Sequence, residues 1–304
     1  MSVTEAALVL SDGSRFEGEA IGARHEGGVS TGEVVFNTVL AGYQEVLSDP
    51  SYAGQIVTFT YPHIGNYGSA GADDESPTPR CAGVVVRDLA RRHSSWRAEA
   101  SLEDWLKRHG IAGIAGVDTR RLTRHLRNHG AVPGAFGTAS EAEVRAAAAG
   151  ALGTDDTDLT RVVTTSKPYE LAGGPRRVVA VDYGIKRSLF AHLQPIAGVT
   201  VVPAGFSADD ILALEPDGVL LSNGPGDPAA VTHAPAMIAE LLGRVPVFGV
   251  CMGHQLLATA LGASTYKLPF GHHGGNHPVQ DTLTNSIEIT SQNHNYCVNP
   301  KGIQ

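Results

Sequence analysis

The strongest constraint on the fold of this chain is an apolar run at residues 245–250, which leads into a cysteine flanked by glycines. The β-branched and aromatic residues of this run predict a short strand, buried on both faces in a parallel sheet. From Gln255 onward, the apolar residues fall on one face of a helix. Cys251 therefore lies at a strand-to-helix turn, where Gly249 and Gly253 leave room for a tight, strained backbone.

Such a turn is a nucleophile elbow, because it exposes a reactive side chain beside the unpaired N–H groups of a helix. These groups and the helix dipole favour a thiolate, and they can stabilise an oxyanion on a carbonyl under attack. The predicted chemistry is acyl transfer through a thioester. The alternative is a buried structural cysteine, the more common role of a lone Cys. The flanking glycines and the strand-turn-helix context favour the nucleophile.

Composition indicates a reducing compartment. The three cysteines, Cys81, Cys251 and Cys297, lie far apart and lack metal-ligand spacing, which argues against a disulfide framework or a zinc site. A net charge of -8 gives no indication of nucleic-acid binding. No signal peptide is apparent, and no run approaches the roughly 18 apolar residues of a membrane span. We therefore expect a cytoplasmic protein without a membrane segment.

A length of 304 residues predicts two domains. We expect an N-terminal domain over residues 1–160, a linker over 161–176 and a second domain over 177–304. The first domain is predicted to be a mixed, β-rich α/β domain with a loop-like segment at 41–54. Its expected strands are 7–10, 15–19, 32–38 and 55–61, and its expected helices are 102–109, 120–128 and 140–151.

The second domain is predicted to be a doubly wound, mostly parallel sheet, because short apolar strands alternate with helices there. Ligands of such sheets gather at the carboxyl ends of the strands. Two of these ends carry unusual loops, one at Cys251 and one in the Gly- and Pro-rich segment 222–228, and we expect them to line one pocket. The expected strands are 177–182, 199–203, 217–221 and 245–250, and the expected helices are 185–194, 207–215 and 233–243.

Over essentially its whole length the chain resembles the glutamine-hydrolysing small subunits of carbamoyl-phosphate synthetase, whose second half is a class I glutamine amidotransferase domain. The elbow alone indicates only the amidotransferase superfamily. The His-His-Gly-Gly-Asn-His block at 272–277 and the N-terminal motifs are typical of the small-subunit family. The segments that carry the resemblance are 32–38, 42–45, 49–52, 60–66, 118–123, 222–228, 246–257, 270–279 and 291–294.

The resemblance implies that Cys251 attacks the side-chain amide of glutamine, releasing ammonia and leaving a glutamyl thioester that water hydrolyses. Met252 stands where leucine is frequent and Asn295 where glycine is frequent, although backbone contacts survive both changes. Ser51 lies in the first domain, so the pocket would be completed across the domain interface. Alternative interpretations make Ser51 a turn serine and Gln255 a solvated helix residue. The implied glutamine-binding residues are Ser51, Gly224, Gly226, Met252, Gln255, Asn293, Asn295 and Tyr296.

The family supplies its general base and orienting carboxylate from a His- and Glu-containing segment near the C-terminus, and the sequence stops at Gln304 before such a segment. We therefore expect an incomplete chain with little glutaminase activity by itself. His254 is expected to point away from the thiol, and His294 to lie beside the glutamine loop. For His272, His273 and His277 a packing or hydrogen-bonding turn is favoured over a metal cluster. No metal or cofactor is expected in this subunit.

The resemblance further implies a partner, the large synthetase subunit, which combines the ammonia with bicarbonate and ATP to make carbamoyl phosphate for arginine and pyrimidine synthesis. ATP and its metal are expected in that partner, because the sequence has no phosphate-binding Gly-x-x-x-x-Gly-Lys-Ser/Thr loop. One alternative is another class I amidotransferase, against which the long N-terminal domain argues. The other is a non-catalytic regulatory or scaffolding subunit.

Overall fold

The computed structural model describes residues 4–299 and 301, and its contacts divide the chain into two compact units. Unit 1 comprises Met1–Gly153 and Leu268–Asn295, and unit 2 comprises Thr154–Lys267 and Tyr296–Gln304. This division differs from the expected bounds, because residues 268–295 group with the N-terminal part. The expected linker over 161–176 contains most of α5 (Thr160–Val163) and the first half of β10 (Tyr169–Asp182).

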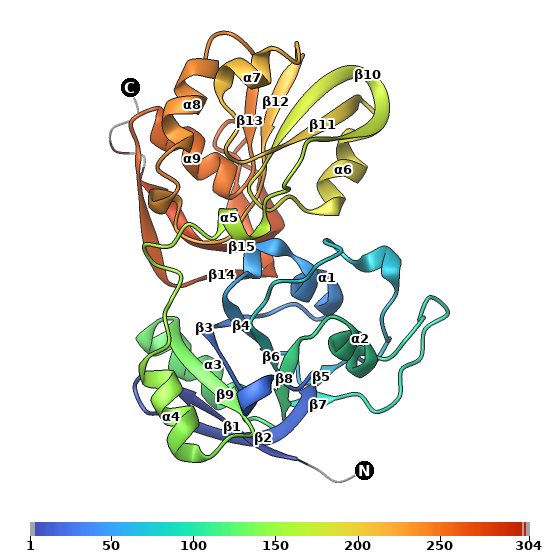
Figure 1. Ribbon diagram of the computed structural model, residues 1–304, viewed down its shortest axis with the longest axis vertical. Coiled ribbons are helices and arrows are strands. Elements are labelled where there is room, and N and C mark those ends of the chain that lie inside the picture. Colours follow the sequence, from blue (N-terminus) through green and yellow to red (C-terminus); the bar gives the residue numbers. More distant parts are fainter. Residues whose placement is uncertain (1–3, 300, 302–304) are drawn as a thin grey trace. The chain divides into compact units, whose positions relative to one another are not determined.

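Seven strands of unit 1 form a closed barrel in the order β1-β2-β8-β6-β4-β3-β9 (Figure 1). The pairs β3/β4, β4/β6 and β6/β8 are parallel, and the remaining neighbours are antiparallel. The predicted hairpin and strands of this half are confirmed. The barrel strands are β1 (Glu5–Leu10), β2 (Arg15–Gly22), β3 (Val29–Asn37), β4 (Gln55–Phe59), β6 (Gly83–Val85), β8 (Ala112–Ala115) and β9 (Val132–Gly137).

The strands of the barrel carry apolar side chains on both faces, and each face is covered by other buried residues. Leu8, Leu10 and Val34 join one buried cluster, which also receives side chains from α3 (Thr119–His129). Their neighbours face the other way: Val9 packs with residues of α4, and Val35 packs with residues of α1 and α2. Successive side chains of a strand point to opposite faces, so a strand that is apolar throughout needs cover on both sides.

The three predicted helices of unit 1 are confirmed, and each begins at a side-chain cap. The oxygens of Ser101, Asp118 and Ser140 accept backbone N–H groups of α2, α3 and α4, which satisfies donors that a helix leaves unpaired. Further elements of the unit are α2 (Leu102–Arg108), α4 (Glu141–Ala149), β5 (His63–Ile64), β7 (Asp88–Leu89), η1 (Glu26–Gly28) and η3 (Gly71–Asp73).

The expectation of a loop over residues 41–54 was wrong. The segment contains the helix α1 (Tyr43–Ser48) and the 3-10 turn η2 (Pro50–Tyr52). Tyr43 and Leu47, one helical turn apart, are fully buried against the barrel, so packing stabilises a helix too short to show a periodic pattern.

The doubly wound parallel sheet predicted for the second domain is confirmed in unit 2, and its strand order is β11-β10-β12-β13 (Figure 1). The helices α7, α8 and α9 share a buried cluster with one face of the sheet, and α6 packs on the other. No helix among residues 4–299 and 301 has the length and apolar character to cross a bilayer. The elements are β11 (Ala197–Pro203), β12 (Gly218–Leu221), β13 (Val247–Gly249), α6 (Arg187–Leu193), α7 (Ala208–Leu212), η4 (Pro228–Ala230), α8 (Ala234–Leu241) and α9 (Met252–Ala260).

The prediction that the strand at 245–250 is buried on both faces was wrong. Phe248 in β13 is 68% exposed, whereas Val247 packs against the helical cluster on the opposite face. The reason is position in the sheet: β13 is the edge strand among the described residues, and α6 packs on β11 at the opposite edge.

Candidate active site

The predicted strand-turn-helix at Cys251 is confirmed. Cys251 is the N-cap of α9 and has φ 52 and ψ -108, a conformation that residues other than glycine rarely adopt. The side chain is half-buried rather than sealed inside apolar packing. A strained backbone at a strand-to-helix turn is what presents the nucleophile in a nucleophile elbow.

Close backbone approach explains both glycines beside the elbow. A Cβ at Gly253 would lie 2.1 Å from the carbonyl oxygen of Leu221, and one at Gly249 would lie 2.5 Å from the Gly253 backbone. The Gly253 N–H donates to the carbonyl oxygen of Ser222 at 2.9 Å. The elbow is therefore fixed against the carboxyl end of β12, the neighbouring strand.

The first residues of α9 supply backbone donors beside the thiol. Met252 is buried and is the first residue of α9. No helical residue lies one turn before it, so its N–H has no carbonyl acceptor within the helix. The Gln255 N–H donates to the carbonyl oxygen of Cys251 at 3.0 Å, which closes the first turn. His254, expected to point away from the thiol, is exposed.

The strand order of the sheet reverses between β10 and β12. Polar side chains after β12 hydrogen-bond to the backbone that follows β10. The Tyr183 N–H donates to Ser222 Oγ at 2.9 Å. Asn223 Nδ2 donates to the carbonyl oxygen of Gly184 at 2.8 Å, and its Oδ1 accepts the Lys186 N–H at 3.2 Å. Sequence reasoning missed this role of Asn223, because its partners lie 37 and 39 residues away.

Gly224 and Gly226, two predicted glutamine contacts, occupy positions without room for a side chain. A Cβ at Gly224 would lie 2.2 Å from the carbonyl oxygen of Tyr183. Gly226 has φ 89, and a Cβ there would lie 2.7 Å from the carbonyl oxygen of Thr157. Backbone packing therefore accounts for both glycines, and their contact with glutamine stays a prediction.

Gln255 is not a solvated helix residue, which overturns the alternative interpretation of this position. It is 5% exposed, and its Nε2 donates to the carbonyl oxygen of Tyr296 at 2.7 Å. The Tyr296 hydroxyl donates to Asp155 Oδ1 at 3.2 Å, and Lys267 Nζ donates to Asp155 Oδ2 at 2.7 Å. Burial, followed by the charges of Asp227 and Asp155, raises the pKa of Tyr296, so the phenol remains a donor.

Sequence reasoning missed Asp155 and Lys267. Asp155 lies in a polar run that reads as a loop, and nothing in its spacing indicates a partner more than 100 residues away.

The remaining predicted contacts, Ser51, Asn293 and Asn295, lie in unit 1. The Ser51 N–H donates to Asp49 Oδ1 at 2.8 Å, at the start of η2. That geometry also fits the alternative of a turn serine.

Asn293 and Asn295 flank the buried ring of His273 on strands β14 (Ser264–Gln280) and β15 (Ile287–Asn299). Asn293 Oδ1 lies 2.9 Å from His273 Nδ1, and Asn295 Oδ1 lies 2.8 Å from His273 Nε2. The opposite ends of both amides face carboxylates: Asn293 Nδ2 donates to Asp49 Oδ2 at 3.2 Å, and Asn295 Nδ2 donates to Glu33 Oε2 at 2.9 Å. His273 thus takes part in hydrogen bonding, as its motif suggested.

The structure brings the predicted site residues together in two groups, one in each unit. Their assembly into one glutamine pocket stays a prediction. Unit 1 holds Ser51, Asn293 and Asn295, and unit 2 holds Gly224, Gly226, Cys251, Met252, Gln255 and Tyr296.

The ring of His272 lies tilted to that of His277 and edge-on to that of His294, at centroid distances of 5.1 and 4.9 Å. Within the described residues, no three His, Cys, Asp or Glu side chains are grouped as metal ligands would be.

The two other thiols have unreactive surroundings. Cys81 is buried among apolar side chains of unit 1, and burial raises its pKa to about 12. Burial also raises the pKa of Cys297. A thiol rather than a thiolate therefore predominates at both positions near neutral pH.

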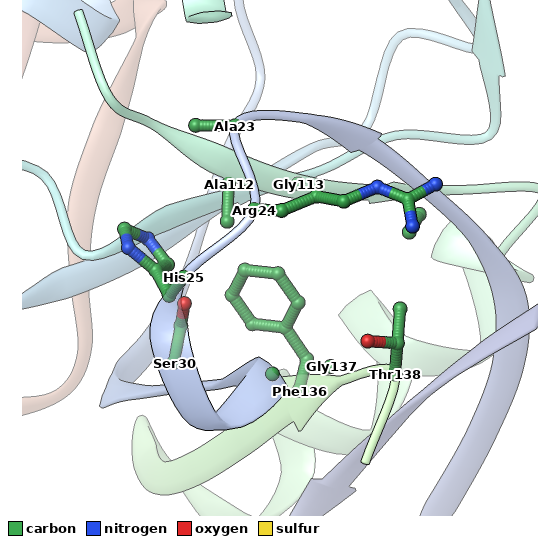
Figure 2. Close-up of a pocket in the computed structure, with 11 residues that line it drawn as sticks. Ala23, Arg24, His25, Ser30, Ala112, Gly113, Phe136, Gly137 and Thr138 are labelled. Carbon is green, nitrogen blue, oxygen red and sulfur yellow. The ribbon is translucent and has the colours of Figure 1, made fainter. Parts of the chain in front are cut away.

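A small cavity in the barrel wall is separate from these groups (Figure 2). Its volume is about 30 Å³, which is the room for roughly one water molecule. Figure 2 shows the Phe136 ring between His25, Ser30 and Thr138. This cavity is too small for an amino-acid substrate.

The sequence matches two family models. Residues 8–136 match the model described as carbamoyl-phosphate synthase small chain, CPSase domain, and residues 179–304 match the model described as glutamine amidotransferase class-I.

Curated relatives called carbamoyl phosphate synthase small chain extend the similarity over nearly the whole chain, as three of them illustrate. The protein from Xylella fastidiosa strain Temecula1 is 50% identical over 96% of this chain and 82% of its own length. The protein from Syntrophotalea carbinolica is 47% identical over 98% of this chain and 84% of its own length. The protein from Symbiobacterium thermophilum is 49% identical over 95% of this chain and 81% of its own length.

Proposed function

The chain belongs to the carbamoyl-phosphate synthase small-chain family and carries a class I glutamine amidotransferase domain, and from this we propose that Cys251 hydrolyses glutamine through a thioester. The observation that carries the proposal is the backbone of Cys251, a non-glycine residue at φ 52. Such a conformation costs about 1–3 kcal/mol and persists where function requires it.

In the first half-reaction, Cys251 Sγ attacks the carbonyl carbon of the glutamine side-chain amide. The new S–C bond and the oxyanion form together, and the N–H groups at the start of α9 stabilise that oxyanion. The C–N bond then breaks, and the amide nitrogen leaves as ammonia after taking up the proton lost by the thiol. In the second half-reaction, water adds to the thioester, glutamate is released and the proton returns to sulfur.

Glutamine is held by the residues that the resemblance supplies. In unit 2, Gln255 fixes the carbonyl of Tyr296, while the 224–226 loop offers backbone groups without obstructing side chains. In unit 1, Ser51, Asn293 and Asn295 contribute polar groups, two of them through the buried network around His273.

The ammonia is consumed by a large synthetase subunit, with bicarbonate and ATP, to give carbamoyl phosphate in the cytoplasm for arginine and pyrimidine synthesis. The name of these relatives, small chain, supports a larger partner. ATP and its metal bind that partner, since the given sequence has no phosphate-binding Gly-Lys-Ser/Thr loop.

Labelling by a diazo-ketone analogue of glutamine tests the proposal, with modified peptides identified by mass spectrometry. We expect stoichiometric alkylation of Cys251, protection by free glutamine, and little reaction at Cys81 or Cys297. Equal labelling of all three cysteines, or none at Cys251, would favour the scaffolding alternative. Iodoacetamide provides the control, because it reports thiol exposure without recognising a glutamine site.

A further inference from the structure

One short segment of unit 2, residues 154–158, contacts two of the elements that are predicted to hold glutamine. These elements are the loop at Gly226 and the residue Tyr296, which lie far apart in sequence. The segment contains no helix or strand, and all three parts belong to unit 2. A single irregular stretch of chain therefore connects two separate parts of the predicted site.

Hydrogen bonds and close packing attach this segment to the loop. The Asp227 N–H donates to the carbonyl oxygen of Thr157 at 3.3 Å, and the Asp156 N–H donates to Asp227 Oδ2 at 3.2 Å. A Cβ at Gly226 would lie 2.7 Å from the carbonyl oxygen of Thr157, so the two backbones approach closely. The other carboxylate oxygen of Asp227 accepts the Ala229 N–H at 2.9 Å. Asp227 thus links its own loop to the segment.

The backbone bends at Asp156, between the two attachment points. Asp156 has φ 55, a left-handed conformation that Asp adopts more readily than most residues but that remains uncommon. Such a conformation persists where the surroundings determine it, and here the bond to Asp227 does so. The bend separates Asp155, which contacts Tyr296, from Thr157, which contacts the loop.

The side chain of Asp155 holds Tyr296 at the far end of its ring. The Tyr296 hydroxyl donates to Asp155 Oδ1 at 3.2 Å, and Lys267 Nζ donates to Asp155 Oδ2 at 2.7 Å. A carboxylate accepts hydrogen bonds at both oxygens, so the two bonds are compatible, and the ion pair with Lys267 helps to orient the carboxylate.

Tyr296 is therefore held at two places, because Gln255 also binds its backbone carbonyl. Rotation about the Cα–Cβ bond of Tyr296 would break the bond to Asp155. Groups that are ordered before a ligand arrives lose less entropy on binding, so the ligand binds more tightly. The Asp155 side chain is 56% exposed, and competition by water keeps the effect of its single bond modest.

We propose that the segment 154–158 orders the glutamine site of unit 2 before glutamine binds, and that Asp155 is the positioning residue for Tyr296. Asp155 acts through the Tyr296 hydroxyl and does not itself contact glutamine. The proposal rests on the proposed function, because it takes Gly226 and Tyr296 as glutamine contacts.

A double-mutant cycle with Asp155→Ala and Tyr296→Phe tests this role, since the phenylalanine keeps the ring and removes only the hydroxyl. The readout is the glutamine concentration that halves labelling of Cys251 by a low, fixed concentration of the diazo-ketone analogue. We expect each single variant to need about threefold to tenfold more glutamine than the wild type, the effect of one lost hydrogen bond. The double variant should need no more than either single variant, because both changes remove the same bond.

Two controls separate positioning from charge and from folding. Asp156→Asn removes the same charge at the neighbouring position, where the Asp side chain has no hydrogen bond or ion pair within the described part of the chain. Asn also tolerates a positive φ, so this variant should keep the protection of the wild type. In Asp155→Ala, the rate of labelling by saturating analogue should fall less than the protection by glutamine, whereas a general folding defect would lower both.

An effect of Asp155→Ala that persists undiminished in the Tyr296→Phe background would overturn the positioning role. Loss of protection in Asp156→Asn as large as in Asp155→Ala would overturn it as well, by assigning the effect to charge. Absence of glutamine protection in the wild type would count against the proposed function instead. Urea unfolding of the same four proteins would then still test the segment, because additive losses of stability would refute the coupling of Asp155 to Tyr296.

Discussion

The side-chain amide of Gln255 donates to the backbone carbonyl of Tyr296 at 2.7 Å, across 41 residues of sequence. The bond joins α9, the helix that begins after Cys251, to β15. Gln255 therefore acts on the candidate site by holding a second backbone segment, besides any direct contact with glutamine.

Gln255→Ala should weaken the protection of Cys251 by free glutamine more than it slows alkylation by saturating diazo-ketone, because the change frees the Tyr296 segment and leaves Cys251 in place. The variant should also lose about 1–3 kcal/mol of unfolding free energy, since a buried carbonyl loses its donor. Labelling at a series of glutamine concentrations and urea unfolding measure the two effects. His254→Ala, at the exposed neighbouring position, is the control. Slower alkylation with unchanged protection by glutamine would remove the binding role.

Gly253→Ala should destabilise the chain by about 1–3 kcal/mol and abolish thioester formation, because its Cβ would lie 2.1 Å from the Leu221 carbonyl oxygen. Gly205→Ala is the matched control in the same unit, since a Cβ there meets nothing within 4 Å. Urea unfolding and mass spectrometry of the acylated chain give the readouts. Wild-type stability for Gly253→Ala would contradict the close packing of the elbow.

Cys251→Gly and Cys251→Ala should both lose the labelling by the diazo-ketone analogue, yet the glycine variant should be the more stable by about 0.5–2 kcal/mol. Glycine relieves the strain of a positive φ at a smaller entropic cost. At Cys297, on the extended strand β15, the alanine variant should instead be more stable than the glycine variant. Thermal or urea unfolding of the four variants decides the matter, and the same order at both positions would refute strain at the elbow.

Cys81 should remain unalkylated in the folded chain. Its buried thiol should also make the free energy of unfolding decrease at alkaline pH. Burial raises the pKa of its thiol from 9.0 to about 12, so the unfolded state releases the proton first. The unfolded state then binds fewer protons, and stability falls as the pH rises above 9 towards 12. Unfolding free energies of the wild type and Cys81→Ala should therefore converge over that interval. A constant difference between them would contradict the burial of this thiol.

Local pattern sufficed for much of the fold. The parallel sheet of unit 2 follows from apolar runs that alternate with capped helices, and the elbow follows from Gly249, Cys251 and Gly253. Sequence patterns did not predict the features that depend on tertiary packing. The helix at Tyr43 and Leu47 depends on burial against barrel strands distant in sequence, and the exposure of Phe248 depends on the edge position of β13.

Local sequence was enough to predict the strand-to-helix turn and the place of Cys251 in it, because such a strained turn needs small residues at fixed spacing. Which polar side chains meet depends on how the whole chain folds. Gln255 with Tyr296, Asn223 with Gly184 and His273 with its two asparagines are pairs formed by chain folding. Hydrogen bonds require contact within about 3 Å, and sequence spacing carries no record of which distant residues achieve it.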